Sequence, residues 1–336
     1  MTAAAAGSSV VMGGDAAKGP PVMLAPMAGI TDLPFRRLAL ALGAPMVVSE
    51  MVASGEIVTG GAQARARAEL GLGCDRTVVQ IAGREPGVMA EAARRVVDLG
   101  AHSIDINMGC PARRVTGGAA GSGLLRDPDR ALRIVAAVVG AVAVPVSLKT
   151  RLGWDETCTA VPDLLARAEA AGVVRVTLHG RTRCDFYAGR ADWAAIGQRT
   201  AHLRSPVVAN GDIDSVRAAR TAMAASGAVG VMVGRAARGR PWLVGQIAAA
   251  LAGQPVPMAP TGAALVDLVA GHHEAMLAFH GRDLGLRVAR KHLGWYAEAA
   301  GSPAPLRRAL VTAESPAAVR ALLPAAFGSL PPRRAA

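Results

Sequence analysis

Reactive side chains stand at the ends of several short apolar runs in this sequence. Cys110, Lys149 and His179 each end or follow such a run. An ammonium group at the end of an apolar segment is costly to remove from water unless a partner compensates it. Two kinds of partner are open for Lys149: a structural carboxylate such as Asp105, or an electron-rich cofactor ring that gains negative charge on reduction, with His179 in the same pocket. The residue types leave both a redox site and a structural ion pair open.

Cys110 is placed where a thiol can do chemistry. It lies between Gly109 and Pro111, where a run of alternating apolar and polar residues stops. A free thiol has a pKa of about 8.5, so at neutral pH it is mostly protonated and can donate a proton. We expect Gly109 to let the backbone approach a flat ring and Pro111 to stiffen the exit of the turn. The alternative is a small buried apolar side chain, the usual fate of an isolated cysteine; the position at a strand end favours the proton donor.

The other three cysteines, Cys74, Cys158 and Cys184, fit that alternative. The four cysteines are far apart and form no C-x-x-C pair and no cysteine and histidine set with the spacing of zinc ligands. We therefore expect no metal site and no disulfide framework, and reduced thiols in a reducing compartment.

Apolar runs and amphipathic helical stretches alternate along most of the chain. Such alternation favours a parallel sheet, and eight repeats favour a closed (β/α)8 barrel over an open sheet. The predicted helices include 34–42, 86–99, 128–139 and 215–225. The eight predicted strands are 22–25, 45–49, 77–82, 103–107, 145–149, 174–178, 206–209 and 229–233.

Polar residues end all eight runs, and in such a barrel chemistry collects at the carboxyl ends of the strands. Gly211 and Gly234 follow the last two runs, where barrels bind phosphate through backbone N–H groups, and Arg235 can add a charge-assisted contact. A Gly-Arg pair elsewhere is more often a helix-capping turn, and its place after the eighth run favours phosphate. Gln80 suits the pyrimidine edge of a flavin or closes a layer of the barrel, and its type alone does not decide.

The composition divides the chain into four parts. A low-complexity tail covers 1–19, the barrel 20–250, a helical and net positive region 258–325, and a basic tail 326–336. A glycine and proline linker at 253–257 separates the barrel from the helical region. No run approaches the roughly 18 apolar residues of a membrane span, and the start lacks a secretory signal, so we expect a cytoplasmic protein.

The charge balance points to a polyanionic partner. The chain has 37 basic and 25 acidic residues, a formal net charge of +12, while 51% hydrophobic residues suffice for a large core. Nucleic acid is a natural partner for such a surface, and an arginine-favouring codon usage is the alternative. A basic helical region beside an enzyme-like barrel suggests a clamp for an anionic substrate.

Six motifs follow one another in the chain. Another, Arg290-Lys291-His292 with Gly294-Trp295-Tyr296, lies in the helical region. In this order they resemble the flavin-dependent tRNA-dihydrouridine synthases, and the last motif is similar to the bacterial B-type subgroup; the likeness runs from Leu24 to Tyr296. The six motifs are Ala25-Pro26-Met27-Ala28-Gly29-Ile30-Thr31-Asp32 with Pro34-Phe35-Arg36, Val48-Ser49-Glu50-Met51, Asp105-Ile106-Asn107-Met108-Gly109-Cys110-Pro111, His179-Gly180-Arg181-Thr182, Asn210-Gly211-Asp212-Ile213 and Gly234-Arg235.

The resemblance implies a barrel that holds FMN at its mouth and reduces the C5–C6 double bond of a D-loop uridine in tRNA with NADPH. Hydride would pass from reduced FMN to C6, and a proton from Cys110 to C5. By motif position FMN would be held by Pro26, Met27, Ala28, Gln80, Lys149, His179, Asn210, Gly211, Asp212, Gly234 and Arg235. We expect a monomer with no protein partner.

Contacts with tRNA are expected at basic and polar residues near the barrel mouth and on the helical region. Near Cys110, Arg113 and Arg114 would either lower the pKa of the thiol or face tRNA phosphates. The chain departs from the family pattern at Cys184 and Asp185, where alanine or a polar residue and glutamine are common, which bears on nucleotide contact. The expected tRNA contacts are Asn107, Arg113, Arg114, Arg151, Arg181, Arg287, Arg290 and Lys291.

Two other functions account for part of the pattern. A flavin barrel that acts on a small molecule, such as a dihydroorotate-type dehydrogenase, explains the FMN set but gives the basic helical region no use. An RNA-binding protein without turnover explains the charge but not Cys110, Lys149 and His179 at strand ends.

Overall fold

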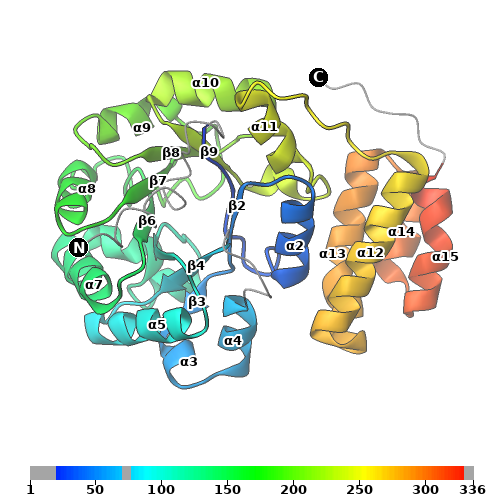
Figure 1. Ribbon diagram of the computed structural model, residues 1–336, viewed down its shortest axis with the longest axis horizontal. Helices are drawn as coiled ribbons and strands as arrows, with labels where there is room; N and C mark the ends of the chain where they lie inside the picture. Colours follow the sequence, from blue (N-terminus) through cyan, green and yellow to red (C-terminus); the bar gives the residue numbers. More distant parts are fainter. Residues whose placement is uncertain (1–19, 70–76, 329–336) are drawn as a thin grey trace, which may run out of the picture.

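Eight parallel strands close into a barrel in the computed structural model, which describes residues 20–69 and 77–328 (Figure 1). The barrel strands are β1 (Val22–Leu24), β2 (Met46–Val48), β4 (Thr77–Ala82), β5 (Ile104–Met108), β6 (Val146–Arg151), β7 (Arg175–His179), β8 (Val207–Asn210) and β9 (Gly230–Val233). Strand β1 pairs with β2 and β9, and β2 pairs with β4, which closes the ring. The predicted (β/α)8 barrel is confirmed.

One short strand was missed by the sequence analysis. Strand β3 (Val52–Ala53) pairs with β4 at Ile81 and Ala82 and lies outside the ring. Two residues are too few to show the alternation by which a strand is found in a sequence.

Local signals set the starts of many helices around the barrel. Asp32, Asp127, Asp192 and Ser215 each accept a hydrogen bond from the backbone N–H three residues later, as N-cap residues do. The four helices predicted above are present as α2, α5, α7 and α10. The helical segments of the barrel are α2 (Leu33–Ala41), α3 (Ser54–Val58), α4 (Ala62–Ala68), α5 (Pro86–Asp98), α6 (Arg113–Thr116), η1 (Gly121–Arg126), α7 (Pro128–Ala141), α8 (Val161–Ala170), α9 (Trp193–Thr200), α10 (Val216–Ser226), η2 (Arg235–Ala237) and α11 (Leu243–Leu251).

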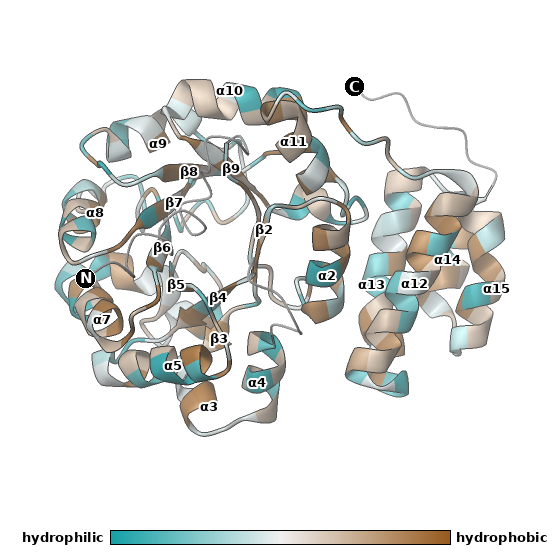
Figure 2. Ribbon diagram, in the orientation of Figure 1, coloured by the Kyte–Doolittle hydropathy of each residue, from teal (hydrophilic) through white to brown (hydrophobic). Residues whose placement is uncertain are grey.

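The barrel strands are largely hydrophobic, and the helices around them carry both hydrophobic and hydrophilic residues (Figure 2). An apolar cluster joins residues of β1, β2, β4, β8 and β9, namely Met23, Ala25, Met46, Val48, Val78, Val208 and Met232. Strands β4 to β8 also contribute buried polar residues: Gln80, Asp105, Asn107, Ser147, Thr177, His179 and Asn210. The polar groups of the barrel therefore gather on the arc from β4 to β8.

Four helices follow the barrel and pack beside it next to α2 (Figure 1). They are α12 (Gly262–His280), α13 (Arg282–Ala300), α14 (Ala304–Thr312) and α15 (Pro316–Phe327), and they share one apolar core with Trp242. The prediction of helical structure after the linker is confirmed. Within the described residues, no helix combines the length and apolar character that crossing a bilayer requires. The predicted tail 1–19, Cys74 and the basic residues after 328 lie outside the described residues.

A group of polar and aromatic residues joins the helical region to α2, and we call it the interdomain cluster. His280 Nε2 lies 2.8 Å from Asp32 Oδ2, and His272 Nδ1 lies 2.9 Å from the Tyr296 hydroxyl. The rings of His272 and His292 lie 5.7 and 5.5 Å from that of Phe35. The cluster consists of Asp32, Phe35, His272, His280, His292 and Tyr296.

Candidate active site

A hydrogen-bonded network of four side chains, which we call the mouth network, lies in the polar arc of the barrel. Gln80 donates to Asp105 Oδ2 at 2.7 Å and accepts from Asn107 Nδ2 at 2.7 Å. Ser147 donates to the other oxygen of Asp105 at 2.7 Å. Burial raises the pKa of Asp105, and its hydrogen bonds oppose that rise. All four residues are almost completely buried, so their side chains are fixed by these bonds.

The network ends at the turn that carries Cys110. Asn107 Oδ1 accepts from the backbone N–H of Gly109 at 3.2 Å and of Cys110 at 3.0 Å. On the other side, Ser122 donates its backbone N–H and its hydroxyl to the Cys110 carbonyl, at 3.1 and 2.9 Å. The thiol itself is partly exposed. A partly exposed thiol on a backbone held from both sides can present a proton to a ligand at the barrel mouth.

The glycine before Cys110 makes a close packing contact. A Cβ on Gly109 would lie 3.3 Å from the backbone of Thr150 on the neighbouring strand. Close packing against β6 therefore favours glycine here, and the predicted approach of this backbone to a flat ring stays a prediction.

Lys149 has a neutral partner. Its Nζ donates to Asn210 Oδ1 at 3.0 Å, and Asn210 Nδ2 in turn donates to the carbonyl of Met232 at 2.8 Å. Burial lowers the pKa of Lys149 to about 8, with Arg151 adding repulsion and Asp105 opposing the shift. The carboxylate suggested as its structural partner is bonded to Gln80 and Ser147 instead. The ammonium therefore retains capacity to stabilise a further negative charge.

His179 ends β7 as a neutral imidazole. Burial holds its pKa well below the ordinary value, and the positive charges of Lys149, Arg151 and Arg181 act in the same direction. Gly211 packs against it: the glycine has φ +112°, and a Cβ there would lie 2.7 Å from His179 Cδ2. A neutral imidazole can donate or accept one hydrogen bond toward a ligand.

An ion-pair cluster follows β7, β8 and β9. Arg181 binds both oxygens of Asp212, at 3.0 and 2.7 Å, and Arg235 lies 3.6 Å from the same carboxylate. The pKa of Asp212 is lowered: burial opposes this, and the hydrogen bonds from Arg181 and the Ala191 N–H outweigh it. Asp212 has φ +53°, a conformation that non-glycine residues rarely adopt. The cluster brings three predicted residues together and ties the loops after these strands to one another.

Arg151 also holds loops. Its Nε donates to the Gly109 carbonyl at 2.8 Å, and its Nη1 donates to the Thr182 and Phe186 carbonyls at 2.7 and 2.8 Å. Arg151 and Arg181 are almost completely buried. Their predicted role as direct tRNA contacts is not supported by this burial; they position the backbone around Cys110 and the loop after β7.

An exposed aromatic pair beside these arginines was missed by the sequence analysis. Tyr187 lies between Arg151 and Arg235, whose Cζ atoms are 5.4 and 4.6 Å from its ring centroid. Phe186 packs edge-on against Tyr187 at 5.1 Å, and its φ is +55°. Two adjacent aromatic residues in the segment that follows a predicted strand were the sequence signal from which this pair could have been identified. Asp185, one of the departures noted above, accepts from Thr182 and closes the turn before them.

The loop after β1 forms another part of the rim. Pro26 and Met27 are half-buried and Ala28 is exposed. The Met27 carbonyl accepts from the N–H groups of Ile30 and Thr31, and Gly29 donates to the buried carboxylate of Glu50. The loop is thereby held with Ala28 facing outward.

The remaining basic residues divide into two kinds. Arg113, Arg114 and Arg287 are exposed. Arg290 is turned toward the end of α14, with Nη2 3.5 Å from the Ala313 carbonyl, and its predicted contact with tRNA is not supported by that direction. Lys291 is half-buried at the junction of the barrel and the helical region.

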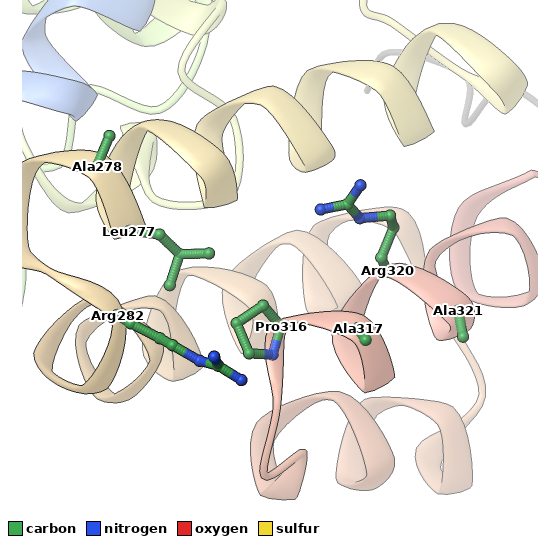
Figure 3. Close-up of a pocket in the computed structure, with 7 residues that line it drawn as sticks. All are labelled: Leu277, Ala278, Arg282, Pro316, Ala317, Arg320 and Ala321. Carbon is green, nitrogen blue, oxygen red and sulfur yellow. The ribbon is translucent and has the colours of Figure 1, made fainter.

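An open groove of about 870 Å³ lies elsewhere, between α12, α13 and α15 (Figure 3). Its lining consists of Leu277, Ala278, Arg282, Pro316, Ala317, Arg320 and Ala321, and contains none of the strand-end residues. Arg320 pairs with Glu274 at 3.3 Å. The groove belongs to the helical region and is separate from the barrel mouth.

The match to a family model decides what kind of enzyme this barrel is. The model described as dihydrouridine synthase (Dus) matches residues 23–329, which includes the mouth network, Cys110 and the helical region. The chain belongs to the dihydrouridine synthase family. A dihydrouridine synthase is an oxidoreductase, and the predicted family and enzyme class are confirmed.

Relatives of the dihydrouridine synthase family match nearly the whole chain. A probable tRNA-dihydrouridine synthase of Rhodobacter capsulatus is 59% identical over 310 residues, 92% of this chain and 95% of its own length. The tRNA-dihydrouridine synthase B of Xanthomonas axonopodis pv. citri is 48% identical over 311 residues, 93% of this chain and 94% of its own length.

Among solved structures, a 2-naphthoyl-CoA reductase complex is similar with a TM-score of 0.53 and 12% identity. The match covers 70% of this chain and half of that structure. At this identity the likeness concerns the barrel fold alone.

Proposed function

We propose that this dihydrouridine synthase reduces the C5–C6 double bond of a D-loop uridine in tRNA, with FMN as cofactor and NADPH as reductant, in the cytoplasm and as a monomer. The observation that carries the proposal is the turn at Cys110, a partly exposed residue that interacts electrostatically with Lys149, which in turn donates to Asn210. The names of the relatives support tRNA as substrate.

The residues at the mouth fit a flavin. Lys149 is a cation whose only hydrogen-bond partner among the described residues is an amide oxygen, so it can stabilise negative charge on a reduced ring. Gly211 packs directly against His179, where a Cβ would lie 2.7 Å from Cδ2, so a glycine lets the backbone after β8 approach the imidazole. Gly234 and Arg235 would hold the phosphate, Gln80 and Asn210 the ring edge, and Pro26, Met27 and Ala28 one face. When bound, FMN supplies the hydride for C6 of the uracil.

The protein supplies the proton for C5. Cys110 would donate the proton from Sγ, as a positioned general acid. Its backbone is fixed by Asn107 and Ser122, and Arg151 holds the preceding carbonyl, so the position of the thiol depends on bonds already made before substrate arrives. Such preorganisation reduces the cost of aligning donor and acceptor in the transition state.

The target uridine has to leave its stack to reach the barrel. Everting a nucleotide is least costly in a loop, where bases are already partly unstacked. The exposed Arg113 and Arg114 follow Cys110 directly and Arg287 lies on α13, so the RNA backbone would meet positive charge on both sides of the mouth. The net charge of +12 favours such association.

The test is mass mapping of dihydrouridine in tRNA from cells that lack the protein, followed by restoration with purified protein, tRNA and NADPH or NADH. We expect loss of dihydrouridine at one D-loop position and its return with NADPH. Intact modification in the deleted cells would refute the proposal. Oxidation of dihydroorotate by the purified protein, with no activity on tRNA, would favour the small-molecule dehydrogenase instead.

A further inference from the structure

Lys291 extends from α13 of the helical region to the rim of the barrel. A Cβ built on Gly29 would lie 3.2 Å from Lys291 Nζ, and Gly29 has φ +71° at the end of the loop that contains Ala28. The ammonium therefore lies over the backbone of the loop assigned above to the cofactor. No other lysine of the described residues belongs to the helical region.

The Lys291 ammonium has no partner among the residues that the structure describes. Within residues 20–69 and 77–328, it takes part in no hydrogen bond and no ion pair. Lys291 is half-buried, so it loses part of its contact with water, and no hydrogen bond from the described residues compensates that loss. Its backbone is firmly held, because His292 and Leu293, the next two residues, are each only 1% exposed. A cation at the rim with no partner among the described residues, carried by a firmly held helix, is available to bind an anion.

The anion that reaches this place during the proposed reaction is a phosphate of the RNA. A uridine that enters the mouth toward Cys110 leaves its ribose and flanking phosphates at the rim. Arg235, whose side chain is 42% exposed, lies after β9 next to β1 and adds positive charge to the same edge. A contact at the flanking phosphate limits how far the nucleotide can enter.

We propose that Lys291 binds a phosphate that flanks the target uridine and thereby positions the uracil ring relative to Cys110. This inference rests on the proposed function. The reductant NADPH also carries phosphates, and the test below separates the two sources.

The test compares Lys291→Met with Lys291→Arg and with Arg287→Met, a control that removes an exposed charge one helical turn earlier. Substrates are unmodified tRNA and tRNA with a single neutral methylphosphonate on the 5′ or the 3′ side of the target uridine. For a charge-assisted contact we expect Lys291→Met to lower kcat/KM about 10- to 100-fold, with partial recovery in Lys291→Arg.

The combination of variant and substrate decides the question. At one of the two positions the methylphosphonate should slow the wild-type enzyme and Arg287→Met but have no further effect on Lys291→Met. Additive losses at both positions would overturn the inference. A slower reduction of bound flavin by NADPH in Lys291→Met, measured without tRNA, would assign the site to the dinucleotide and also overturn it.

The failure of this inference is distinguishable from that of the proposed function. Wild-type protein that forms no dihydrouridine refutes the proposed function itself. Active wild-type protein together with a Lys291→Met variant of unchanged kcat/KM but lower thermal stability refutes only the phosphate contact, because it assigns the side chain to holding the barrel and the helical region together.

Discussion

The mouth network and the interdomain cluster are both buried and polar, but they differ in how far their hydrogen bonds are satisfied. In the mouth network, Gln80 uses its amide oxygen and nitrogen, and Asp105 uses both oxygens. In the interdomain cluster, His272 Nε2 and both ring nitrogens of His292 are buried and have no hydrogen-bond partner among the residues that the structure describes. The hydrogen bonds of the mouth network fix the positions of its side chains. The interdomain cluster contains imidazoles in buried surroundings, where protonation would place a positive charge away from water.

Two histidines of the interdomain cluster, His272 and His292, have lowered pKa values. Burial lowers the pKa of His272 to about 4, although the charge of Asp32 opposes the shift. Burial also holds the pKa of His292 well below its ordinary value, with His272, Lys291 and His280 adding repulsion and Asp32 opposing it. The difference teaches that the mouth network holds its side chains through hydrogen bonds, whereas protonation of the interdomain cluster would oppose its burial, which predicts an interface between barrel and helical region that is sensitive to pH.

The largest expected effect comes from the residue that the mouth network positions. Cys110→Ala should lower dihydrouridine formation about 100- to 10,000-fold, the usual contribution of a positioned acid, while the protein keeps its yellow flavin. The measurement is product formation by mass spectrometry together with the visible absorbance of the cofactor. Cys184→Ala is the matched control, since Cys184 is exposed, and it should remain active. Full activity of Cys110→Ala would remove the thiol from the reaction.

Asn107 tests whether the network fixes the thiol. Asn107→Ala removes the acceptor for the N–H groups of Gly109 and Cys110 and should lower kcat about 100-fold, since small displacements of reacting groups cost rates of that order. Asn107→Asp keeps that acceptor but replaces the donor to Gln80 by a second acceptor and adds a buried charge, so it should retain more activity than Asn107→Ala if the turn is the important partner. Steady-state kinetics check both variants, and equal loss in the two would show that Gln80, and not the turn, is the important partner.

His292 tests the pH sensitivity of the interdomain cluster. Because its pKa is lowered on folding, the unfolded chain binds more protons below about pH 6.5, and stability is lost as pH falls from that value. Each such imidazole contributes about 1.4 kcal/mol per pH unit in that window. His292→Phe should therefore reduce the slope of unfolding free energy between pH 6.5 and 5, roughly the window in which His272 also acts.

The measurement is chemical denaturation of the wild type and His292→Phe at several pH values. The same experiment on His202→Gln, an exposed histidine on the barrel, provides the control. An unchanged slope in His292→Phe would show that the loss of stability at low pH arises outside the interdomain cluster.

The smallest effect concerns the contact between the barrel and α13. Arg238 Cζ lies 5.0 Å from the centroid of the Trp295 ring, and such a contact is worth about 0.5–1 kcal/mol at a partly exposed site. Arg238→Ala should lower the free energy of unfolding by about that amount, and Arg238→Lys by less. Denaturation followed by tryptophan fluorescence measures both. A loss of unfolding free energy as large as that expected for breaking a buried polar network would contradict this description of a partly exposed contact.

Much of the fold and the centre of the site could be predicted because both follow from local patterns. Alternating apolar runs and helical stretches give the barrel, and polar residues that end strands necessarily gather at one mouth. Cys110, Lys149, His179 and Asn210 were predicted on that ground, and the structure places them on the arc from β5 to β8. The two-residue strand β3 has no such pattern.

Side-chain partners could not be predicted, because they depend on residues far apart in the chain. Asn210 as the partner of Lys149, and the loop carbonyls bound by Arg151, exist only once the strands are adjacent. The same holds for Gly109, whose packing against Thr150 is a contact between neighbouring strands.

The sequence by itself determined the barrel, the reactive residue types at its mouth and the positive charge of the helical region, since these depend on composition and short-range spacing. The tertiary structure decided which of the charged residues are free. It buried Arg151 and Arg181 in contacts with loops and Asp212, and it brought Lys291 onto Gly29 with no hydrogen-bond or ion-pair partner in the described part of the chain. The physical reason is that the free energy of a charge depends on its solvation and its neighbours, which the folded chain alone defines.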